Sequence, residues 1–109
     1  KQMAQDFERH IARATGTSGA TIYTAGGDDA VVSIRLTNIH SAAIAVDCFV
    51  TTGGNDYYLI KGVSIPAASS LELIDGGSRF VLQNSDALKV DTDTASSLDT
   101  WVSVISDIS

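Results

Sequence analysis

The sequence predicts an all-β fold, an antiparallel β-sandwich of about eight strands that is jelly-roll-like, with one α-helix at its N-terminal end. Two observations predict the sandwich. From Ala20 to Ile108, short apolar runs alternate with clusters of Gly, Asn, Asp and Ser, a pattern typical of strands joined by turns. No helical stretch separates these runs, so no crossover helix is available to connect parallel strands. A third observation, apolar residues at helical spacing in residues 2–14, predicts the helix.

The predicted helix has one apolar stripe, and Gly16 ends it because glycine accepts the left-handed conformation that closes a helix. We therefore divide the chain into an amphipathic helix at residues 1–16 and a sandwich at residues 17–109. A helix this short is marginal alone in water, and a sandwich fills its own core. The stripe is thus expected to dock on another chain; its residues are Met3, Phe7, Ile11 and Ala14.

The strands of the predicted sandwich follow one another with turns between them. Residues 21–24 form a short first strand, and residues 31–39 alternate, with Val32, Ile34 and Leu36 expected to face the core. Residues 44–50 place Cys48 inward, and glycines 53 and 54 predict a hairpin to residues 57–61. Residues 62–65 either continue this strand or re-enter the sheet before an edge or corner at Pro66. The later runs are residues 71–74, 80–82, 88–90 and 98–105.

Composition narrows the function classes. The chain has 109 residues, enough for one domain, with 44% hydrophobic and only 18% charged residues, so we expect another chain to cover part of its surface. The net charge of −6 disfavours binding to nucleic acid, which needs a basic stripe. Cys48 is the single cysteine and is expected to be a small buried hydrophobe. No apolar run approaches the length of a membrane span, and no secretory start is evident, so we expect a soluble protein made in a cytoplasm.

No residue pattern predicts catalysis, a metal or a cofactor. Two loops carry paired carboxylates that could bind calcium, namely Asp28 with Asp29 and Asp91 with Asp93. Neither loop has the 12-residue calcium-binding pattern, so we interpret these aspartates as solvated turn residues. The two histidines, His10 and His40, lack metal-ligand spacing. The serines lie in expected loops without a nucleophile-elbow motif, and there are few aromatics to line a glycosidase cleft.

Three aromatic residues are candidates for a contact surface. Tyr57 and Tyr58 are adjacent on one predicted strand, and Trp101 lies on the last strand, facing away from Val102 and Val104. Such residues serve either a contact between subunits, which we favour, or a platform on which sugars stack.

Five stretches carry a resemblance to a known family. They are MAQDFERHIARATGTSGATIYTA, VVSIRLTNI, DYYLIKGVSIPAASSLELIDG, FVLQNSDALKV and DTASSLDTWVSVISDIS. Together they resemble small virion structural proteins of tailed phages, particularly the marine cyanophage-like group. The resemblance implies a non-enzymatic, oligomeric part of the particle, with no catalytic residues to transfer. The usual glycine of the IPAASS turn is Ala68 here, and Lys1 and Gln2, which precede Met3, are interpreted as an addition.

Two functional hypotheses follow. The first is a phage virion structural protein, a tail, fibre or capsid-decorating component made in the host cytoplasm. It assembles as a homo-oligomer, expected to be a trimer, through the helix stripe and sheet surfaces, and contacts other virion proteins. The second is a carbohydrate-binding module that uses Tyr57, Tyr58 and Trp101, with a host-surface glycan as its ligand and calcium in the Asp91 loop as an option. Neither hypothesis involves nucleic acid or a membrane, and no cofactor is predicted.

Overall fold

The computed structural model describes residues 6–106, without the side chains of residues 6, 14 and 75–78. All paired strands run antiparallel, which confirms the predicted all-β class. The described residues include no helix long and apolar enough to cross a membrane. The strands are β1 Asp6–Thr15, β2 Ala20–Thr24, β3 Asp29–Asn38, β4 Ile44–Thr52, β5 Asn55–Ile65, β6 Ser70–Leu82, β7 Ala87–Thr92 and β8 Leu98–Ser106.

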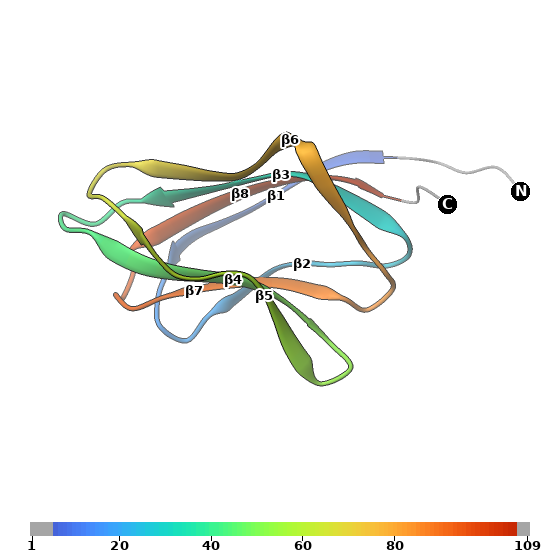
Figure 1. The fold of residues 1–109 in the computed structure, drawn as a ribbon, viewed down its shortest axis with the longest axis horizontal. Helices are drawn as coiled ribbons and strands as arrows, with labels where there is room; N and C mark the ends of the chain where they lie inside the picture. The colour runs from blue at the N-terminus through green and yellow to red at the C-terminus, as the bar shows by residue number, and fades with distance from the viewer. Residues whose placement is uncertain (1–5, 107–109) are drawn as a thin grey trace, which may run out of the picture.

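The strands form two sheets, which face each other across the core (Figure 1). Sheet A has the order β1-β8-β3-β6 and sheet B the order β2-β7-β4-β5. Hydrogen-bonded partners are nested, because β4 pairs with β5, β3 with β6, β2 with β7 and β1 with β8. The chain is therefore one long hairpin rolled into two layers, and this is the strand order of an eight-stranded jelly roll.

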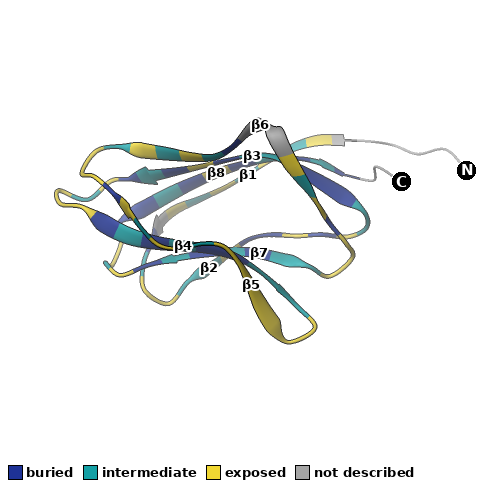
Figure 2. Cartoon of the chain, in the orientation of Figure 1, coloured by how far each residue is buried: buried dark blue, intermediate teal, exposed yellow. Residues whose placement is uncertain are grey.

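The core lies between the two sheets and consists of every second residue of the central strands. In sheet A, Ile34 and Leu36 of β3 are fully buried with Val102 of β8, and in sheet B Val46 and Cys48 of β4 lie opposite them. Figure 2 shows the buried positions on the central strands of both layers and mostly exposed positions along β5. The expectation that Cys48 is a small buried hydrophobe is confirmed, and burial raises the pKa of its thiol to about 12.

The predicted N-terminal helix is wrong for the described residues, because residues 6–15 form strand β1. β1 is an edge strand of sheet A whose partners on β8 run from Asp6↔Ser106 to Thr15↔Leu98. A spacing of four residues puts Phe7 and Ile11 on one face of either a helix or a strand, so the apolar stripe fits both. The ladder to β8, which pairs the backbone groups on one side of residues 6–15, decides between them. The first residue of the stripe, Met3, lies outside the described residues.

The inward side of β1 carries polar residues, which hid its strand alternation. Glu8 accepts a hydrogen bond from the Ser106 hydroxyl at 3.2 Å and contacts the His10 Nε2 atom at 2.9 Å. The His10 ring lies 4.4 Å from the Tyr23 ring, centroid to centroid. Tyr23 in turn donates a hydrogen bond to Asp29, which is buried, so Asp29 is not the solvated turn residue that the sequence predicts. One end of the interior is thus a polar network that joins β1 to its neighbours.

The structure decides between the alternatives for residues 62–65. They continue the strand of residues 57–61 as β5, with a bulge at Gly62 (φ 66°), whose N–H donates to Asp47 Oδ1 at 2.6 Å. A register shift between Val31 and Ser33 turns Val32 outward, so Val31 is the buried residue there.

The IPAASS turn takes a left-handed residue at Ala68, with φ 57°. The Ser69 N–H donates to the Pro66 carbonyl at 3.2 Å, which closes the turn. A glycine adopts this conformation without the steric cost of about 1 kcal/mol that alanine incurs. The turn geometry therefore agrees with the glycine that the resemblance leads one to expect.

Candidate interaction faces

The outer surface of sheet A, called face A below, exposes large apolar side chains. Phe7 is 81% exposed, Ile11 54% and Trp101 49%. Ile11 on β1 lies directly opposite Trp101 on β8 in the antiparallel ladder, and Phe7 lies opposite Ile105 in the same ladder. Cross-strand partners on one face of a sheet contact each other, so these side chains form a strip along β1 and β8.

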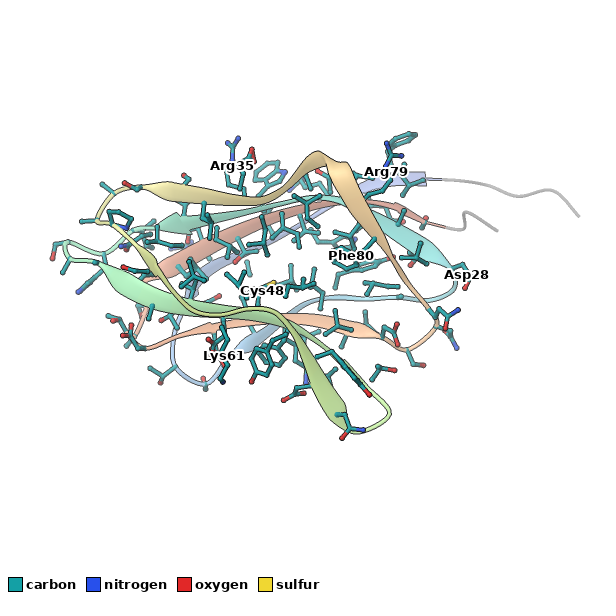
Figure 3. The ribbon with its side chains drawn as sticks, viewed as in Figure 1. Asp28, Arg35, Cys48, Lys61, Arg79 and Phe80 are labelled. Atoms are coloured by element: carbon teal, nitrogen blue, oxygen red, sulfur yellow. The ribbon has the colours of Figure 1, made fainter. Side chains whose placement is uncertain are left out.

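Arginines surround this strip. The Arg9 guanidinium lies 5.4 Å from the centre of the Trp101 ring, within the range of a cation–π interaction. Arg35 on β3 lies opposite Trp101 from the other side and donates from Nη2 to Glu72 Oε1 at 3.2 Å. This hydrogen bond and the charge of Glu72 raise the pKa of Arg35. Figure 3 shows Arg35 and Arg79 projecting outward from sheet A.

A shallow depression of about 1000 Å³ lies on face A. Ile11 and Trp101 line it together with charged side chains from all four strands of the sheet, namely Arg13, Arg35, Glu72 and Asp99. The depression therefore combines an aromatic surface with both acidic and basic groups, which is a surface suited to contact with a polar partner as well as an apolar one.

The outer surface of sheet B, called face B below, has aromatic and acidic residues. The Tyr58 ring lies 4.9 Å from the Phe49 ring, and the Lys61 ammonium lies 4.4 Å from the centre of the Tyr58 ring. Tyr57 is 58% exposed but lies on the other side of β5 from Tyr58, because it pairs with Val50, which packs against the core. The tip of this β4–β5 hairpin projects from the body (Figure 1). In Figure 3, Lys61 lies on the side of the molecule opposite Arg35.

Two carboxyl groups lie side by side on face B. Asp47 on β4 and Asp91 on β7 are direct partners in the antiparallel ladder. Desolvation raises the pKa of Asp91 to about 6, and the hydrogen bond and negative charge of Asp47 act in the same direction, while Lys61 acts against it. Asp91 is thus an acid whose charge changes just below neutral pH.

The structure separates the residues that the sequence predicts to work together. Trp101 belongs to sheet A, whereas Tyr57 and Tyr58 belong to sheet B, so the three do not form one sugar-stacking platform. Of the expected docking residues, Phe7 and Ile11 are exposed as predicted, on a strand rather than a helix. Met3 and the side chain of Ala14 lie outside the described part of the chain.

Sequence reasoning missed the arginines that flank the strip. Arg9 and Arg13 alternate with Ile11 along β1, and Arg35 has the matching position on β3. Their period of two would have marked one face of a sheet, had residues 6–15 been interpreted as a strand. Within residues 6–106, no group of three or more His, Cys, Asp or Glu residues could hold a metal ion.

Comparisons with known proteins identify the fold and no family. No family model matches the chain, and no curated protein matches it. A solved structure of the disulfide-linked pili that form Bacillus endospore appendages is 14% identical, covers 98% of this chain and 89% of its own, and has a TM-score of 0.56. These values show a shared fold.

Two viral structures are also similar. A structure of infectious bursal disease virus, Gx strain, is 12% identical with a TM-score of 0.51, and the match covers 98% of this chain and 32% of the viral chain. A pentameric capsid protein isolated from metagenomic phage sequences is 18% identical, with coverage of 94% and 62% and a TM-score of 0.41, too low to bear on the assignment.

Proposed function

We propose that this chain is a non-enzymatic structural subunit of a phage virion, in which copies of the chain associate through face A. Within that proposal it is a tail, fibre or capsid-decorating component of a tailed phage of the marine cyanophage-like group. Its oligomer is a trimer, and its further partners are other virion proteins.

The observation that carries the proposal is the apolar strip of Phe7, Ile11 and Trp101. An edge strand normally avoids exposed apolar side chains, because they invite association with other chains. Here two of them lie on edge strand β1, next to Trp101. Aromatic residues and arginine are the residue types enriched where protein chains contact one another. A strip of this composition therefore supports a role in assembly.

The fold supports the same role. Jelly rolls recur in viral capsid domains, and the solved structures that share this fold above include a viral chain and an appendage subunit. The likeness to disulfide-linked pili does not extend to their linkage, because Cys48 is the only cysteine of this sequence and is buried between the sheets. Assembly of this chain is expected to be non-covalent.

Light scattering on the purified protein tests the assembly. We expect the wild type to form an oligomer and Ile11→Ser with Trp101→Ser to raise its dissociation constant by about 30-fold or more, since aromatic anchors dominate interfaces. Ile39→Ser is the matched control, because Ile39 is 50% exposed, close to the 54% of Ile11, and lies beyond the end of β3. A wild type that is monomeric at every concentration contradicts the proposal. Neighbouring genes for capsid, neck or baseplate proteins would support the virion assignment.

One observation favours a second candidate, a carbohydrate-binding module. Trp101 lines the depression on face A together with Arg35, Glu72 and Asp99, and a ring beside such hydrogen-bonding groups suits a sugar. Trp101 is the only tryptophan, so its fluorescence reports on this site alone. A fluorescence change on addition of a host-surface glycan would favour this candidate, whereas no change across a broad glycan panel would count against it.

A further inference from the structure

We infer that the surface recognised by face A is face B of a second copy of this chain, so that copies associate head to tail. The inference rests on the proposed self-assembly and adds which two surfaces meet. The alternative is a symmetric contact of face A with face A, in which the same patch is used by both copies.

The first argument is the distribution of charge. All four arginines of the sequence, Arg9, Arg13, Arg35 and Arg79, belong to β1, β3 and β6 of sheet A. The acidic groups of the depression on face A are Glu72 and Asp99. The four arginines outnumber these two carboxylates, and one of them, Arg35, is already bonded to Glu72. A contact between two copies of face A would therefore bring together an excess of positive charge, and like charges opposed across an interface are unfavourable.

Face B has the complementary charge. Asp47 and Asp91 lie side by side at its centre, and Asp56 contributes to the electrostatic environment of Asp91. Two lysines, Lys61 and Lys89, accompany these three aspartates. When face A meets face B, the arginines of face A lie opposite carboxylates of face B. This charge complementarity speeds association and determines which two faces bind each other.

The second argument is the match of aromatic groups and area. Face A presents Trp101 beneath Arg9, and face B presents Tyr58 against Phe49. A sheet surface four strands wide and about nine residues long covers about 600 Å² per copy, at the lower end of specific interfaces. Two such surfaces can therefore bury enough area for a reversible contact, with one aromatic anchor on each side.

A head-to-tail contact leads to a different assembly from a symmetric one. A symmetric contact of face A with itself stops at two copies, whereas a contact between different faces continues until it closes a ring or extends as a filament. Face A and face B lie on opposite sides of the sandwich (Figure 3), so copies that stack in line form a filament, and a cyclic trimer needs a rotation between successive copies. A fixed mass of three copies in light scattering indicates the ring, and a mass that grows with concentration indicates the filament.

The carboxyl group of Asp91 adds a pH dependence to this contact. As the pH falls from neutral to below the pKa of Asp91, the group gains a proton and face B loses negative charge. The charged groups around it are Asp47 on β4, Asp56 and Lys61 on β5, and Lys89 on its own strand β7. We expect association to weaken while the fold is retained. A carboxyl whose pKa is raised in the folded state binds its proton more tightly there, so its protonation favours folding.

Mixing two variants tests the inference. The face A variant is Ile11→Ser with Trp101→Ser, and the face B variant is Tyr58→Ser with Asp91→Lys. Each variant alone is expected to be monomeric. In an equimolar mixture the intact face A of one variant can bind the intact face B of the other, whereas the two altered faces cannot extend the complex. We expect a species with twice the mass of one copy, and circular dichroism of each variant verifies its fold.

Three outcomes would contradict either the head-to-tail contact or the proposed self-assembly. A face B variant that assembles like the wild type shows that face B is not the partner, and the inference is then wrong. Two monomeric variants that give no complex when mixed also overturn it, while assembly of the wild type still stands. A wild type that never assembles contradicts the proposed function itself, before either face is tested.

Discussion

A shortened protein that begins at Gly16 is expected not to fold. The sequence alone makes residues 1–16 a dispensable helix, but the structure makes residues 6–15 the edge strand β1, paired with β8 over most of its length. Without β1, the ladder groups of β8 on that side lose their partners, and Ala12 no longer packs against the core. Each lost backbone hydrogen bond costs about 0.5–1.5 kcal/mol, so the loss of a whole ladder is comparable with the roughly 5–15 kcal/mol that stabilises a typical domain. Thermal unfolding followed by circular dichroism should show no cooperative transition.

The matched control keeps β1 and changes only its outward side chains. In Phe7→Ser with Ile11→Ser the backbone ladder to β8 remains, and both altered side chains are exposed in the wild type. This variant is expected to unfold cooperatively, close to the wild type. If the protein that begins at Gly16 melts cooperatively at the wild-type temperature, then β1 is not needed for folding and the prediction is wrong.

The sandwich itself could be predicted because its inner positions are apolar at a period of two. Ile34 and Leu36 are expected to face inward because they alternate with polar neighbours, and Val102 and Val104 are expected to share one face of the last strand; all four are buried. Strand order could not be predicted in the same way. β1 pairs with β8 and β2 pairs with β7, although these strands are far apart in the sequence. A local residue pattern does not indicate with which other strand a strand pairs.

Face A shows where local patterns fail. Phe7 and Ile11 were identified as exposed contact residues from a four-residue spacing that a strand also satisfies. Trp101 is also a contact candidate from the sequence, but its position beside Ile11 could not be predicted, because the pairing of Ile11 with Trp101 follows from the register of two distant strands. A strand usually shows apolar residues at its inward positions, but β1 has Glu8 and His10 there. These polar side chains are tolerated because they make hydrogen bonds within the fold.

Asn38 is a second residue whose importance only the structure shows, and Asn38→Ala is expected to lower the free energy of unfolding by about 2–4 kcal/mol. The side chain is 1% exposed, at the end of β3. Its amide nitrogen donates to the carbonyls of Ala42 at 2.9 Å, Ile65 at 3.0 Å and Pro66 at 3.1 Å, and its oxygen accepts the His40 N–H at 2.7 Å. Alanine leaves these groups without that partner, so the melting temperature should fall by about 10–20 °C.

Two further variants show that the amide group is responsible. Asn38→Asp keeps the acceptor for the His40 N–H but places a carboxylate oxygen against three carbonyl oxygens. At neutral pH it should destabilise at least as much as alanine, because a buried charge without a donor is more costly than a lost hydrogen bond. Asn84→Ala, at an exposed turn position, should change stability by less than about 0.5 kcal/mol. Urea unfolding measures all three, and an Asn38→Ala protein as stable as Asn84→Ala would refute this role. Because Asn38 joins the end of sheet A to the corner that leaves sheet B, its loss should destabilise the whole sandwich rather than one loop.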